Sequence, residues 1–98
     1  IVDKTGNISE IKGNEQLFVC NIEQLMIENG GISSIIYDNE DLLIAFNSNG
    51  LIRLNYDKGN YLPERIRIDC GVFSLWKDHE QDIVWIGTDE RRIYFQWD

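Results

Sequence analysis

The chain has 98 residues, the length of one small domain, and 43% of them are hydrophobic, which is enough apolar content for a folded core. Nine Lys and Arg residues against 17 Asp and Glu residues give a formal net charge of −8, which argues against binding to nucleic acid or to an anionic membrane surface. The longest apolar run, Leu42 to Phe46, is far shorter than the roughly 20 residues that a membrane-spanning helix needs.

Residue usage favours β-strands along the whole chain. Fifteen isoleucines stand against a single alanine, Ala45, and the chain has eleven aromatic residues. The only proline, Pro63, leaves most segments able to donate backbone hydrogen bonds to a sheet. We therefore expect an all-β fold.

The first third of the chain is the least regular part. A first strand is predicted at about Ile8 to Ile11, and the stretch Leu17 to Cys20 predicts an extra strand. Residues Glu23 to Ile27 fit either a short strand or a helical turn.

The middle of the chain predicts four consecutive strands separated by polar turns. The turn before the third strand contains Asn49 and Gly50, a pair that supplies the positive φ angles of a tight hairpin. The fourth strand carries Pro63 and several charges, which suit the edge of a sheet. The four strands are expected at Ile32 to Tyr37, Leu42 to Phe46, Leu51 to Tyr56 and Tyr61 to Ile68.

The last part of the chain repeats this pattern. Ile32 to Asp38 matches Val72 to Asp78 at an offset of 40, and Leu43 to Asn47 matches Trp85 to Asp89 at an offset of 42. The two extra residues fall in the turn between the first two strands, and Leu51-Ile52 is matched to Ile93-Tyr94. A period near 40 residues with short strands is typical of β-propeller blades. Three strands are expected, at Val72 to Lys77, Ile83 to Thr88 and Ile93 to Trp97.

The predicted fold is a β-propeller fragment of about two four-stranded antiparallel blades, the last of which lacks its outer strand. Residues 1–31 would supply the outer strand of one blade and a connecting segment, residues 32–68 a complete blade, and residues 72–98 an incomplete blade. Trp97-Asp98 reads like Val2-Asp3, so the chain is expected to be two blade periods cut from a ring.

Three segments of the second copy resemble a known family: Ser74 to Asp78, Val84 to Asp89, and Ile93-Tyr94. Together they are similar to the two-component regulator propeller repeat of the extracytoplasmic sensor region of bacterial hybrid two-component histidine kinases. The Trp-Ile-Gly-Thr-Asp string ending at Asp89 is the most specific part. The family usually places glycines after this aspartate, whereas Glu90, Arg91 and Arg92 follow it here.

The resemblance implies a periplasmic, ligand-sensing role, and the ligand class that it implies is an oligosaccharide. Membrane attachment and kinase activity would belong to the parent receptor. The alternative is that these blades have a structural or protein-interaction role, completing the propeller or dimerising it without contacting ligand. Two blades would leave flat apolar faces uncovered, so we expect contacts with other blades or self-association.

Candidate ligand-binding residues lie on the loops between the second and third strands, which open on the usual binding face of a propeller. Arg91 and Arg92 could hold an acidic sugar's carboxylate in a bidentate manner, and Asp89 could accept a hydrogen bond from a ligand hydroxyl. Asn47 and Asn49 occupy the equivalent loop of the first copy. The alternative for each of these side chains, and the commoner one, is a place in a structural or solvated turn.

Other residues are given structural roles. We expect Trp85 to pack between adjacent blades rather than to stack on a sugar. Gly87 and Gly50 are expected to have structural roles in the backbone conformation. Cys20 and Cys70 are expected to remain thiols. The single histidine, His79, lies in a predicted turn, and the strands carry no inward carboxylate pair. The chain is therefore predicted to have no catalytic site, no metal site and no cofactor.

Overall fold

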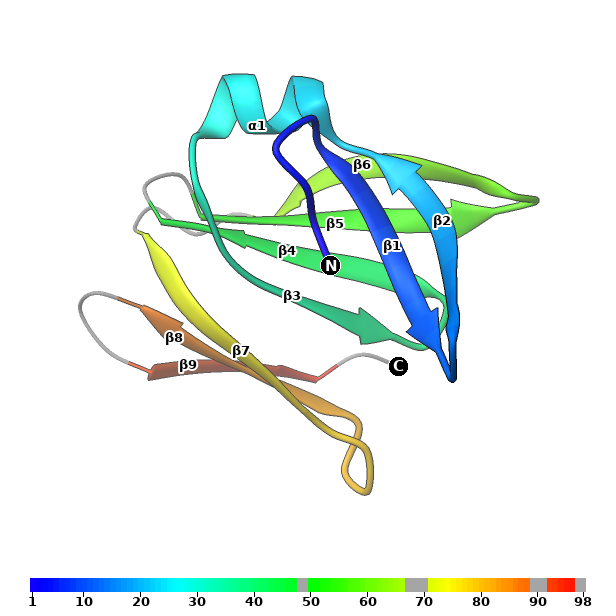
Figure 1. The fold of residues 1–98 in the computed structure, drawn as a ribbon. Coiled ribbons are helices and arrows are strands. Elements are labelled where there is room, and N and C mark those ends of the chain that lie inside the picture. The colour runs from blue at the N-terminus through cyan, green and yellow to red at the C-terminus, as the bar shows by residue number, and fades with distance from the viewer. Residues whose placement is uncertain (48–49, 67–70, 89–91, 97–98) are drawn as a thin grey trace. The chain divides into compact units, whose positions relative to one another are not determined.

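The computed structural model describes residues 1–98 except 48–49, 67–70, 89–91 and 97–98, with the backbone alone for residues 92–96. In this part of the chain the fold is all-β, with antiparallel sheets and one short helix (Figure 1). The elements are β1 (Asn7–Lys12), β2 (Glu15–Asn21), α1 (Glu23–Asn29), β3 (Ile32–Asp38), β4 (Asp41–Phe46), β5 (Gly50–Asp57), β6 (Asn60–Ile66), β7 (Val72–Asp78), β8 (Ile83–Thr88) and β9 (Arg92–Gln96). They form two compact units, Ile1–Gly30 and Gly31–Asp98. Among the described residues, no helix is both long enough and apolar enough to span a membrane.

The first unit is a hairpin followed by the helix. β1 and β2, which cover the two strands expected in this region, pair with each other in antiparallel fashion. The segment that sequence left undecided, Glu23 to Ile27, is helical. The helix ends at Gly30, whose φ of 87° is accessible to glycine and whose amide donates to the Met26 carbonyl.

The second unit contains two sheets that correspond to the two predicted repeats. Their strand orders are β3-β4-β5-β6 and β7-β8-β9, so each strand pairs with its neighbour in sequence. β6, which carries Pro63, lies at an edge of its sheet, where a residue without an amide hydrogen is tolerated. Figure 1 shows the four-stranded sheet in green and the three-stranded sheet in yellow to red.

The two sheets share details of strand pairing that go beyond the match in sequence. Each has an irregularity at the same point of its first strand, between Ile32 and Ser34 and between Val72 and Ser74. Asp38 pairs with Asp41, whereas Asp78 pairs with Ile83, so the two extra residues do lie in the turn.

The predicted match of the third strands is wrong by one residue. Ile44 pairs with Ile52, and its counterpart Ile86 pairs with Ile93. The third strands therefore correspond at an offset of 41, not 42, because four residues separate the paired Gly87 and Arg92, whereas five separate the paired Ala45 and Leu51.

The core of this unit lies between the two sheets. Side chains alternate across a strand, so each sheet directs every second residue toward the other. β4 does not show an alternation of buried and exposed residues, because its apolar run from Leu42 to Phe46 is buried on both faces. The buried residues between the sheets are Leu43, Ala45 and Leu51 from the first and Val72, Leu75, Val84 and Ile86 from the second.

Candidate functional site

The most distinctive surface of the second unit is the outer face of the three-stranded sheet. In the pairing of β7 with β8, Ser74 lies opposite Gly87 and Trp76 lies opposite Trp85. These residues alternate with the buried Leu75 and the other core residues of the sheet, so they face away from β3–β6. We call the four residues Ser74, Trp76, Trp85 and Gly87 the tryptophan face.

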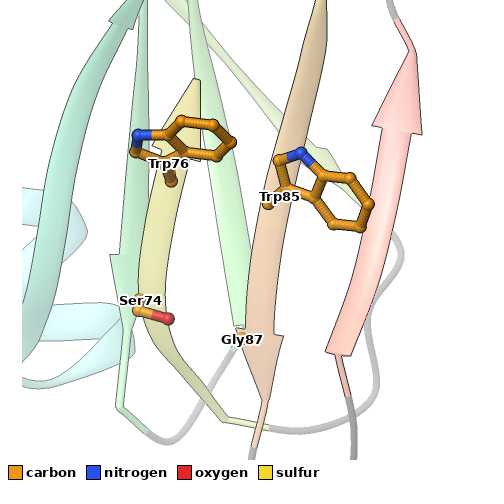
Figure 2. A pocket seen from close by; sticks show the side chains of 4 residues that line it. All are labelled: Ser74, Trp76, Trp85 and Gly87. Atoms are coloured by element: carbon orange, nitrogen blue, oxygen red, sulfur yellow. The ribbon is translucent and has the colours of Figure 1, made fainter. Parts of the chain in front are cut away.

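The tryptophan face is hollowed. Its four residues line a depression of about 310 Å³, and Figure 2 shows the two indole rings beside each other on adjacent strands. Trp76 is 60% exposed, and Trp85 is half-buried. The Ser74 hydroxyl points toward Gly87, where a Cβ atom would collide with it. The depression thus offers two apolar ring systems and one hydroxyl group, which suit an apolar side chain or the carbon face of a sugar ring.

Trp85 therefore does not pack against the sheet β3–β6, although we expected it between blades. Gly50 begins β5 with a φ of 81°, the left-handed backbone that the predicted hairpin requires.

A second cluster of functional groups is buried between the two sheets, at the end where β3 and β7 finish. Lys77 Nζ lies 2.5 Å from Asp38 Oδ1 and also pairs with Asp82. Arg53 Nη1 lies 2.8 Å from Asp38 Oδ2, and Arg53 Nη2 lies 2.6 Å from Asp41 Oδ2. We call these five residues the charge network.

Burial and ion pairing act in opposite directions on the charge network. Burial alone would raise the pKa of Asp38, but hydrogen bonds from Lys77 and Arg53 outweigh it and hold that pKa below its ordinary value. Burial alone would lower the pKa of Lys77, but Asp38 and Asp82 together raise it. Asp38 and Lys77 are therefore both charged at neutral pH.

The charge network is complete within the protein. Every carboxylate in it has a cationic partner, and no group of three or more His, Cys, Asp or Glu residues suited to a metal ion occurs among the described residues. It links the two sheets, because Lys77 belongs to β7 and Asp38 to β3. Its groups pair with one another, which is the arrangement of a structural ion-pair network.

The opposite end of the unit holds the one predicted ligand-binding side chain that the structure describes. Asn47 is exposed and follows β4, and its backbone N–H donates to the Gly31 carbonyl at 3.0 Å. Gly71 approaches its carbonyl so closely that an added Cβ would collide with that oxygen. The start of β3, the end of β4 and the approach to β7 therefore meet at Asn47.

The remaining predicted ligand-binding residues cannot be placed in the same way. Asn49, Asp89 and Arg91 lie outside the described residues, as does Cys70. Arg92 begins β9, and its backbone pairs with Gly87, while its side chain is outside the described part. His79 is exposed in the turn between β7 and β8.

Sequence analysis missed the charge network and the pairing of the two tryptophans. A signal for both was present: the repeat places Asp38 and Lys77 in first strands, and alternation decides which face each side chain occupies. Comparison with protein-family models, curated proteins and solved structures gives no significant match for this chain.

Proposed function

We propose that this chain is a two-blade segment of a β-propeller in the extracytoplasmic sensor region of a hybrid two-component histidine kinase. The observation that carries the proposal is the pair of repeated antiparallel sheets, with the same irregularity in the first strand of each, packed face to face around a shared apolar core. Propeller blades are sheets of this kind that follow one another in sequence. The Trp-Ile-Gly-Thr-Asp string of the second copy supports the receptor family.

In this proposal the segment contributes to oligosaccharide binding at the end of the sheets where Asn47 lies. An exposed amide both donates and accepts hydrogen bonds, which suits the hydroxyl groups of a sugar. The meeting of backbone segments from both sheets at Asn47 supports this location, because a ligand there would contact two blades at once. Arg91, Arg92, Asp89 and Asn49 are the further candidate contacts, and the protein acts by binding in the periplasm rather than by catalysis.

The proposal is tested by binding of the full chain to an array of neutral and uronic-acid oligosaccharides, followed by calorimetric titration of any oligosaccharide that is retained. Asn47→Ala and the pair Arg91→Ala and Arg92→Ala should each weaken binding, since each removes a hydrogen-bonding group from the ligand. Asn60→Ala, at the exposed first residue of β6, is the matched control and should leave affinity unchanged. Retention of full affinity by the Asn47 and arginine variants would place the ligand elsewhere.

The alternative function is structural or protein-interacting, and the exposure of Trp76 favours it. In that case the blades complete or dimerise the sensor without contacting ligand. Wild-type signalling by a receptor that carries Arg91→Ala and Arg92→Ala would support this alternative.

A further inference from the structure

The tryptophan face has a counterpart in this chain that is already covered. At the offsets of the repeat, Trp76 corresponds to Ile36, and Trp85 corresponds to Leu43. The other two correspondences are Ser74 with Ser34 and Gly87 with Ala45. The face of the first sheet that carries Ile36, Leu43 and Ala45 is the face on which the second sheet packs. The exposed tryptophan face of the second sheet is therefore equivalent to the face of the first sheet that the second sheet covers.

The charged residues follow the same correspondence. Asp78 is the counterpart of Asp38, the buried carboxylate that receives Lys77 from the second sheet. Alternation puts Asp78 on the same side of β7 as Trp76. It is only half-buried, and its carboxylate accepts hydrogen bonds from the Glu80 amide and from the amide and side chain of Gln81, all in its own turn. Among the described residues, no Lys or Arg forms an ion pair with it.

We propose that the tryptophan face, together with Asp78, is the docking surface for a further sheet of the same repeat. That sheet would place a lysine or arginine onto Asp78 as Lys77 is placed onto Asp38, and aliphatic side chains over the two tryptophans as Leu75 and Ile86 are placed over the first sheet. The inference rests on the repeated blades of the proposed function and not on its ligand.

A second copy of this chain fits the surface less well than a following repeat. In the first sheet, the positions equivalent to Val84 and Ile86 are Leu42 and Ile44, which are already buried in the chain. The position equivalent to Lys77 is Tyr37, which brings no charge to Asp78. A repeat with the residues of β7 and β8 brings both the aliphatic surface and the lysine.

The experiment extends the full chain by a second copy of residues 58–98 placed directly after Asp98. The strand register supports this junction, since the third strands correspond at an offset of 41, which equates Asp57 with Asp98. The added segment supplies a fourth strand for the second sheet and then a third sheet with its own lysine at the Lys77 position. Hydrogen exchange read by NMR, with the added segment alone labelled with nitrogen-15, should show that segment protected in a cooperative manner.

Two variants test the docking surface itself. Asp78→Asn, made in residues 1–98 and keeping an acceptor for the turn, should lower protection of the added segment about tenfold or more, because the buried lysine would keep only the added segment's own counterpart of Asp82 as a partner. Glu80→Gln, in the same exposed turn, is its control and should have little effect. Trp76→Ser should also lower protection in the extended chain, whereas Leu62→Ser, at a 54% exposed residue of β6, should not.

Three outcomes would overturn the proposal. The first is an added segment that exchanges like an unfolded chain, and the second is equal sensitivity to Asp78→Asn and Glu80→Gln. The third is a dimer of the 98-residue chain that Trp76→Ser dissociates, because the occupant would then be a second copy. None of these readouts uses an oligosaccharide, so failure of sugar binding would contradict the proposed function and leave this inference standing.

Discussion

Lys77 and Asp38 join the two sheets of the second unit by a 2.5 Å contact between the Nζ and Oδ1 atoms, although 39 positions separate them in sequence. The Asp38 side chain is fully buried, and the Lys77 side chain is 6% exposed. A charge in such a place is tolerated only when it is paired, so each residue depends on the other.

Removal of Lys77 should therefore be costly. Lys77→Met should lower the free energy of unfolding by about 3 to 5 kcal/mol, because Asp38 would keep a buried charge with one partner fewer. Lys58→Met, at an exposed turn lysine, is the control and should change stability by less than about 0.5 kcal/mol. Urea denaturation followed by circular dichroism measures both, and similar midpoints for the two variants would contradict the assigned role of Lys77.

The pair should also give stability a defined pH dependence. Asp38 has a pKa below its ordinary value of 3.8, so its contribution is present above that value and is lost as the pH falls through the folded-state pKa. Lys77 has a pKa above its ordinary value of 10.5, so its contribution is complete below that value and is lost as the pH rises through the folded-state pKa. Between these limits the pair should contribute no pH dependence to the urea midpoint. The double variant Asp38→Asn/Lys77→Met should lose the decrease in midpoint that the pair causes at low pH and at high pH.

Glycine at position 71 should be required by the close approach at Asn47. Gly71→Ala should lower the free energy of unfolding by about 1 to 3 kcal/mol, because its Cβ would collide with a backbone oxygen that has little freedom to move. Gly31→Ala faces only the side-chain amide of the same Asn47, at 3.3 Å, and should cost less. Thermal unfolding of the two variants makes the comparison, and an equal loss would indicate a general requirement for glycine in these connections.

The two faces of β7–β9 should respond differently to truncation. Ile86 is fully buried in the core between the sheets, so Ile86→Ala should cost about 2 to 5 kcal/mol. Trp76 loses a larger side chain, yet Trp76→Ala should cost less than about 1 kcal/mol in the 98-residue chain, because most of the indole is already in water. Chemical denaturation would show a reversed order if the two faces had been assigned the wrong way round.

The amino-acid sequence was sufficient to predict the all-β class, the position of nearly every strand and the repeat. Those features depend on residue type and on alternation along the chain, as in Leu42 to Phe46 and Ile83 to Thr88, where local pattern is sufficient. The sequence also located the two-residue insertion, because Asp38 and Asp78 anchor the two turns.

The side chains that meet across the two sheets could not be identified without the fold. The pairing of Lys77 with Asp38 and the outward position of Trp85 depend on which face of each sheet is covered, and this is set by packing between residues far apart in sequence. The register of β9 was likewise beyond the sequence match, since Ile93, Tyr94 and Phe95 are consecutive apolar residues and fit an offset of 41 as well as one of 42.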